Sequence, residues 1–245
     1  EFLLDGPIFF VLSYGRREER ASLPSVTRDL DFTCAGWRAW AKTCALPTFA
    51  PEAVLRSALC LKLHAFHDTG AIIAASTTSI PEAMGTPRTW DYRYCWLRDA
   101  YYALGAFRLL GQFEEREQFT RFLLDVAGGA PDLQLAPLYR IDGGSDLAES
   151  TLAHWPGYEG HGPVRIGNAA AQHIQHDIFG EMVLALTPAF LDERFAVESS
   201  RPALDQIERL ARKALSVAGT PDAGIWEYRT ASEPQTFSSL MCWAA

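Results

Sequence analysis

Apolar residues recur at intervals of three and four along much of the chain, which is the spacing of an amphipathic α-helix. Leu55, Leu59 and Leu63, for example, fall on one face, and Pro51 suits the first turn of that helix. Glycine and proline mark helix ends, and Pro188 is expected to stop one of them. The pattern predicts helices over 28–43, 51–67, 97–110, 113–127, 168–186 and 202–218, with a last one from 236 onward.

The first residues follow a different pattern. Residues 7–15 read as a strand and turn belonging to something larger, and a polar stretch follows over 16–25. The last predicted helix reaches Ala245 without a C-cap glycine or a terminal polar turn. We therefore expect the chain to be a fragment.

The connections between the predicted helices alternate between short and long. Three are long, at 68–96, 128–167 and 219–235, and they are rich in Trp, Tyr and Gly. Ordered connections of this length in a compact domain are usually functional. If successive helices alternate in direction, all three connections emerge on one rim. An antiparallel helical toroid with its binding site on that rim accounts for the alternation of short and long connections. Within the second connection, residues 140–146 are expected to form a hairpin turn.

The run from Trp90 to Asp99 fits neither the helical nor the strand period. It contains two Trp, two Tyr, two Arg and two Asp. Aromatic rings offer flat apolar faces, while Arg and Asp offer charged hydrogen bonds. A sugar ring presents the complementary surface of apolar C–H faces and hydroxyl groups. A carbohydrate site is favoured, and a buried Arg/Asp network inside a loop is the alternative.

The third long connection contains a carboxyl between two aromatic residues, in the sequence Ile225-Trp-Glu-Tyr-Arg229. A carboxyl against aromatic surface loses hydration in its charged form, which favours the protonated acid. A glycosidase needs such an acid to protonate the leaving oxygen. The alternative is a surface ion pair between Glu227 and Arg229.

The composition and net charge of the chain limit the classes of molecule that it is expected to bind. The apolar fraction of 48%, the charged fraction of 21% and a formal charge of −8 describe a globular chain suited to a neutral substrate. Net negative charge without a Lys/Arg cluster argues against nucleic acid, and no apolar run approaches a membrane span. An odd number of Cys, five, without a Cys-x-x-Cys pair favours a reducing, cytoplasmic setting. We expect no cofactor and no metal: His173, His176, Asp177 and Glu181 form one helical cluster, but no further cluster completes a ligand set.

Seven stretches, in order along the chain, carry a resemblance to a known family: AASTTSIPE (74–82), TWDYRYCWLRD (89–99), YRIDG (139–143), GYEG (157–160), GPVRIGN (162–168), DAGIWEYR (222–229) and SLMCW (239–243). On these residues the chain resembles the family-15 glycoside hydrolases, the group of glucoamylases and bacterial trehalases. The tryptophan-rich run and the Ile-Trp-Glu sequence are the most specific of them.

The resemblance implies a mainly α fold, an (α/α)6 toroid preceded by an N-terminal β-domain. Here the toroid would be incomplete, with about six helices. Residues 1–15 would be the C-terminal remnant of a β-sandwich domain, 16–48 a linker with a helix, and 49–245 the first half of the catalytic domain.

The resemblance also implies roles for single residues. Glu227 matches the general acid, Arg98 and Asp99 hold the non-reducing-end glucose, and the general base lies beyond Ala245. The remaining substrate-binding positions are Tyr92, Trp96, Trp226, Trp90, Tyr158, Arg165, Asn168 and Arg229.

These observations predict an inverting glycoside hydrolase that releases glucose from the non-reducing end of an α-glucosidic oligosaccharide or trehalose. Because the second carboxylate would be missing, we expect the chain alone to be inactive. A non-catalytic carbohydrate-binding helical domain is the main alternative. A cyclase on a helical toroid would need acidic metal-binding clusters, and Asp142 and Asp146 offer only a turn. The residues leave the oligomeric state open.

Overall fold

The computed structural model describes residues 6–15, 21–130, 132–195, 200–229 and 232–245. The chain divides into two compact units, Glu1–Cys44 and Ala45–Ala245. The described residues are mainly helical, and their strands are short antiparallel pairs. Among them, no helix is long and apolar enough to cross a membrane.

The described residues of the first unit contain one helix, α1 (Leu23–Thr43). It begins five residues before the predicted start at 28, because Ser22 and Ser25 form a reciprocal capping box there. Residues 6–15 lie in no helix or strand, so the strand predicted over 7–15 is not found. No described residue pairs with them to complete a ladder. Their assignment to a β-sandwich domain stays a prediction.

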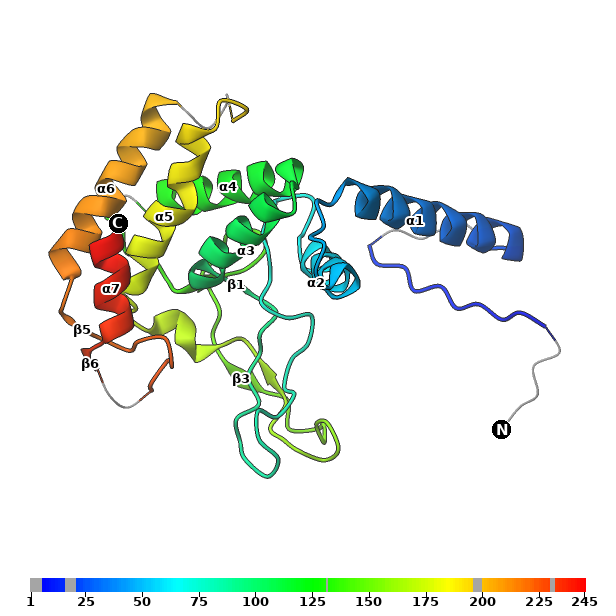
Figure 1. The fold of residues 1–245 in the computed structure, drawn as a ribbon. Helices are drawn as coiled ribbons and strands as arrows, with labels where there is room; N and C mark the ends of the chain where they lie inside the picture. The colour runs from blue at the N-terminus through cyan, green and yellow to red at the C-terminus, as the bar shows by residue number, and fades with distance from the viewer. Residues whose placement is uncertain (1–5, 16–20, 131, 196–199, 230–231) are drawn as a thin grey trace. The chain divides into compact units, whose positions relative to one another are not determined.

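The second unit is built from six helices within the described residues (Figure 1). They are α2 (Pro51–Leu63), α3 (Leu97–Leu109), α4 (Phe113–Gly128), α5 (Asp177–Leu191), α6 (Arg201–Val217) and α7 (Thr236–Ala244). Helix α5 is central: it contacts α3, α4, α6 and α7, and most of its side chains are buried. The boundaries of α3, α4, α6 and α7 lie within one residue of the predicted ones.

Helix α2 ends at Leu63, four residues before the predicted end at 67. The chain turns there because its backbone bonds to the following segment. Ala65 forms an antiparallel bridge with Ile72, and the Ile73 amide donates to the His64 carbonyl. The Phe66 amide likewise donates to the Ala71 carbonyl, so the backbone from His64 to Phe66 bonds to residues 71–73 and does not continue the helix.

The helix predicted over 168–186 is wrong at both ends. Asn168 caps only a short 3-10 turn, η1 (Ala169–Gln172), and α5 starts nine residues later than predicted, at Asp177. Between them the backbone bonds elsewhere: Ile174 accepts from the Ala223 amide, and the His176 amide donates to Asp222. Tertiary hydrogen bonds thus displace the helical ones.

Pro188 lies inside α5 and does not stop it. Proline removes one backbone donor, a cost that packing can offset near a helix end. The turn that contains it is held by Ala185, Leu186 and Ala189, all buried. The helix continues to Leu191.

The long connections contain the strands. These are β1 (Cys95–Trp96), β2 (Leu138–Tyr139), β3 (Ser150–Thr151), β4 (Arg165–Ile166), β5 (Pro221–Asp222) and β6 (Glu233–Pro234). They pair antiparallel as β1–β2, β3–β4 and β5–β6. Residues 140–144 form the predicted turn, but it is not a hairpin, because β2 pairs with β1. The connections that carry β3 to β6 lie together on one side of the helices (Figure 1).

Candidate active site

A cavity of about 910 Å³ opens among these connections. Its walls come from residues 74–99, from the segment around η1, and from the turn before Arg229. Nine residues predicted to bind or act on a sugar line it: Trp90, Tyr92, Trp96, Arg98, Asp99, Asn168, Trp226, Glu227 and Arg229. The structure thus brings most of the predicted site together from three distant parts of the sequence.

Two predicted substrate-binding residues do not line this cavity. Tyr158 is half exposed and belongs to a small bridge with His161. Arg165 turns to Glu149, with its Nη1 atom 2.7 Å from Oε1. Their roles in substrate binding stay predictions.

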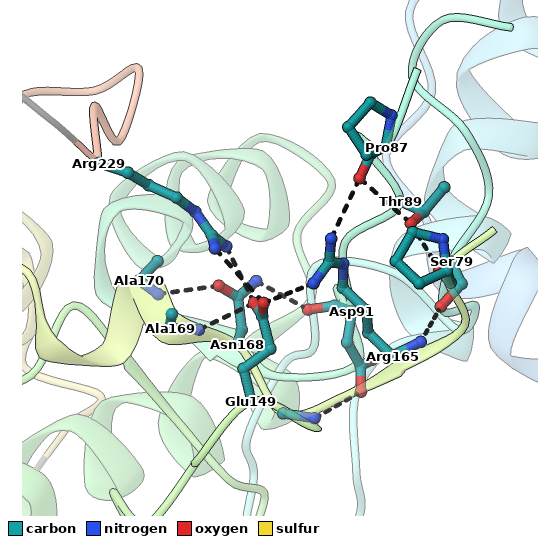
Figure 2. Close-up of polar contacts among 12 residues, drawn as sticks. Ser79, Pro87, Thr89, Asp91, Glu149, Arg165, Asn168, Ala169, Ala170 and Arg229 are labelled. Atoms are coloured by element: carbon teal, nitrogen blue, oxygen red, sulfur yellow. Dashed lines mark hydrogen bonds and ion pairs between the residues drawn. The ribbon is translucent and has the colours of Figure 1, made fainter. Parts of the chain in front are cut away.

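The run from 90 to 99 serves two purposes. Asp91 is fully buried and accepts hydrogen bonds from Arg93 at 2.9 and 2.8 Å and from Tyr94 at 3.2 Å. Its carbonyl also accepts from the Asn168 side chain at 3.0 Å (Figure 2). An Arg/Asp network is therefore present, with Asp91 buried and Arg93 exposed, and the carbohydrate-type surface lies on other residues of the run.

Glu227 is positioned by three donors, which come from β1, from α3 and from the segment between η1 and α5. Its Oε1 accepts from Trp96 Nε1 at 2.6 Å, from Arg98 at 3.1 Å and from Gln175 at 3.4 Å. Glu227 has a φ of 54°, a left-handed conformation that is uncommon outside glycine. Such a backbone needs support from its surroundings, and these three donors contribute to it.

The expected surroundings of this carboxyl need correction. Its sequence neighbours Trp226 and Tyr228 are 73% and 52% exposed, so neither ring covers it fully. Trp96, from β1, contacts it instead and does so through a polar N–H group. The alternative ion pair between Glu227 and Arg229 is not formed, because Arg229 pairs with Glu149.

Arg98 connects the cavity to the core. It donates to the side-chain amide oxygen of Gln175 at 2.8 Å and lies 3.6 Å from the buried carboxylate of Asp177. Burial raises the pKa of Asp177, and the Arg98 charge opposes that shift. Burial likewise raises the pKa of Asp99, which lines the cavity beside Arg98.

Tyr92 and Trp96 form an aromatic wall, with ring centroids 5.6 Å apart. The Tyr92 hydroxyl donates to Glu82 at 2.6 Å, and Glu82 pairs with Arg88 at 2.7 Å. Burial and this carboxylate raise the pKa of Tyr92, so the hydroxyl remains a donor. Sequence reasoning assigned no role to Glu82 or Arg88, although Glu82 ends a stretch that carries the resemblance.

Glu181 lies deeper, on α5, where the sequence pattern indicates for it only the role of a metal ligand. It is fully buried, and among the described residues neither of its carboxyl oxygens has a hydrogen-bond partner. Burial and the nearby Asp177 raise its pKa to about 9. The helical cluster proposed with His173 and His176 does not exist, because those residues precede α5.

Comparison with known proteins gives a consistent result. The family model described as glycosyl hydrolases family 15 matches residues 48–245. A trehalase of Mycolicibacterium smegmatis is 35% identical over 97% of this chain and 36% of its own length. A trehalase of Mycobacterium tuberculosis is 36% identical over 97% of this chain and 35% of its own. A trehalase of Thermoplasma acidophilum is 36% identical over 85% of this chain and 35% of its own.

The chain thus spans about a third of the length of the curated relatives it matches. No solved structure matches it. The matched region contains every cavity-lining residue named above.

Proposed function

The chain belongs to glycosyl hydrolase family 15, and we propose that it supplies the glucose-binding and acid side of the active site of a trehalase-like glycosidase. In this proposal Glu227 protonates the glycosidic oxygen while a water molecule attacks the anomeric carbon. The observation that carries the proposal is the placement of Glu227 in an aromatic-walled cavity with three donors on a single oxygen.

That arrangement assigns different roles to the two carboxyl oxygens. Among the described residues, hydrogen bonds reach Oε1 from Trp96, Arg98 and Gln175. We therefore place the proton on Oε2, to which none of the described residues donates a hydrogen bond. Once the proton has moved to the leaving sugar, the same donors stabilise the carboxylate that remains. This favours the state after transfer, as a proton donor requires.

The cavity walls suit a neutral sugar. Tyr92, Trp96 and Trp226 supply ring faces for the C–H surface of a pyranose. Arg98 and Asp99 supply a donor and an acceptor for its hydroxyls, consistent with the role that the resemblance implies. The names of the relatives favour trehalose as the substrate. An α-glucosidic oligosaccharide with a free non-reducing end is the second candidate.

We propose an inverting mechanism, for which two carboxyl groups roughly 6.5–9.5 Å apart are needed. Glu227 is the first of them. The second, the general base, is proposed to come from sequence beyond these residues, so the chain alone would bind sugar without hydrolysing it. The thiol pattern supports a cytoplasmic location.

The proposal is tested by proton NMR on a full-length protein that contains this chain. Maltose hydrolysed with inversion yields β-glucose from the non-reducing end before mutarotation, and trehalose yields α- and β-glucose in equal amounts. Initial release of α-glucose alone would refute inversion. Saturable glucose binding that is lost in Asp99→Asn, without any hydrolysis, would instead support the non-catalytic binding domain.

A further inference from the structure

Glu149 joins the segments around the cavity, although it does not line the cavity itself. Its Oε1 accepts from Arg165 at 2.7 Å, and its Oε2 accepts from Arg229 at 2.9 Å (Figure 2). The Ala169 amide, at the start of η1, also donates to Oε2 at 3.3 Å. One carboxylate thus connects β4, η1 and the turn that bears Glu227.

The two guanidinium groups share a second partner. The central carbons of Arg229 and Arg165 lie 4.0 and 4.8 Å from the ring centroid of Trp90, which lines the cavity. An arginine at this distance from a ring is attracted by its π face. We call Glu149, Arg165, Arg229 and Trp90 the clasp.

The clasp is well placed to act on Glu227. On its N-terminal side, the turn is fixed by the Ala223 amide, which donates to Ile174, and by Asp222, which accepts from the His176 amide. On the other side, the Tyr228 amide donates to the Ala223 carbonyl within the turn itself, and Arg229, two positions after Glu227, bonds outside the turn to Glu149. Because Glu227 has a left-handed backbone, the turn needs an anchor at both ends to hold that conformation.

The surroundings of Glu149 keep its carboxyl group charged, so it can hold both arginines over the neutral pH range. The side chain of Glu149 is 14% exposed, and burial alone would raise its pKa. Hydrogen bonds from Arg229 and Ala169, with the charges of Arg229 and Arg165, hold that pKa below its ordinary value instead. The carboxylate therefore stays charged over the neutral range, and both ion pairs persist.

We propose that Glu149 is a positioning residue, which fixes the proton-donating carboxyl of Glu227 by holding Arg229 against Trp90 and Arg165. The proposal rests on the proposed function. It adds that the accuracy of proton delivery depends on a residue outside the cavity. It predicts that loosening the clasp lowers kcat for substrates that need protonation and affects others little.

The test compares trehalose with α-glucosyl fluoride, whose fluoride leaves without help from an acid. In a full-length protein containing this chain, Glu149→Gln is expected to lower kcat on trehalose at least tenfold. Its kcat on α-glucosyl fluoride is expected to fall less than threefold. Glu208→Gln, which removes an exposed ion pair with Arg212 on α6, is the matched control and should change neither. Equal losses on both substrates would mean a merely structural role, and no loss would mean that the clasp does not matter.

Two further variants keep the outcomes separate. Arg229→Gln breaks the same contact from its more exposed side and should show the same split if Glu149→Gln fails to fold. Glu227→Gln reports on the proposed function itself, which fails if that variant retains its activity on trehalose. If Glu227→Gln shows the split and both clasp variants behave as wild type, the positioning role alone is refuted.

Discussion

Arg98, in the first turn of α3, donates a hydrogen bond of 3.1 Å to Glu227, which lies 129 residues later in the chain. The same guanidinium binds Gln175 and lies near the buried Asp177, and these two contacts fix its position. The carboxyl of the turn and the first turn of α3 are thus part of one network. Because this network holds a carboxyl in the cavity, the cavity is a candidate active site and not only a sugar-binding surface.

The indole N–H of Trp96 is expected to contribute to catalysis separately from its ring. Trp96→Phe keeps the aromatic face but removes the 2.6 Å hydrogen bond to Glu227. A hydrogen bond to a charged group is worth about 1.5–3 kcal/mol, so kcat on trehalose should fall by roughly 10- to 100-fold. Steady-state kinetics of Trp96→Phe and of Trp243→Phe, an exposed residue of α7, provide the check. Equal kcat values for the two variants would contradict the assigned role.

Asp91 is expected to stabilise the fold and not to act in catalysis. It is fully buried and accepts from Arg93, Tyr94 and the Gly167 amide. Asp91→Ala leaves the buried Gly167 amide and the Tyr94 hydroxyl without this acceptor, which typically costs about 1–3 kcal/mol, and the free energy of unfolding should fall by that amount. Denaturant unfolding measures it. Asp142→Ala, in an exposed pair with Arg140, is the control and should cost far less.

Glu181 should make the stability of the fold depend on pH. Its pKa is about 9 in the folded chain, against an ordinary value of 4.5, because it is buried near Asp177. Between these values folding takes up a proton, so this residue lowers stability as pH rises from about 5 to 9. Glu181→Gln removes that titration. Relative to wild type, the variant should gain up to about 1.4 kcal/mol per pH unit across this range.

Thermal unfolding at pH 5 and pH 8 tests this prediction. The difference in Tm between Glu181→Gln and wild type should be more favourable to the variant at pH 8. Glu114→Gln, on the exposed face of α4, should show no such change. A difference that is the same at both pH values would show that Glu181 is charged in the folded chain.

Gly180 allows α5 and α7 to approach closely. A Cβ atom at this position would collide with the backbone carbonyl of Met241. Gly180→Ala should therefore destabilise the chain by about 1–3 kcal/mol, despite the better helix propensity of alanine. Gly105→Ala, in α3, meets no atom within 4 Å and should stabilise by about 1 kcal/mol. Denaturant unfolding of the two variants should give changes of opposite sign.

The sequence predicts helix boundaries correctly where neighbouring residues along the chain determine them. The boundaries of α3, α4, α6 and α7 follow from apolar period and terminal glycines or prolines. The start of α5 does not, because residues 173–176 bond to the segment at 222–223, almost fifty positions away. A strand at 7–15 was predicted from its composition, but a strand also needs a partner, which composition does not supply.

In the candidate site, too, some residues can be predicted from the local sequence and others only from tertiary contacts. The aromatic run and the Ile-Trp-Glu sequence identified residues that line the cavity, since their side-chain types are unusual for a loop. Glu149 and Gln175 carry no such signal. Each is an ordinary polar residue whose partners lie as much as 80 and 77 positions away in sequence. Only the fold shows that they hold the cavity residues in place.

Hydrolysis by a Glu227→Gln protein decides whether this carboxyl donates the proton. In a full-length protein that contains the chain, kcat on trehalose and maltose should fall by about 10²- to 10⁴-fold, because glutamine has no proton to give. Binding of glucose should be little changed, and α-glucosyl fluoride should still be hydrolysed. A kcat close to wild type on trehalose and maltose would contradict the assignment of Glu227 as the acid.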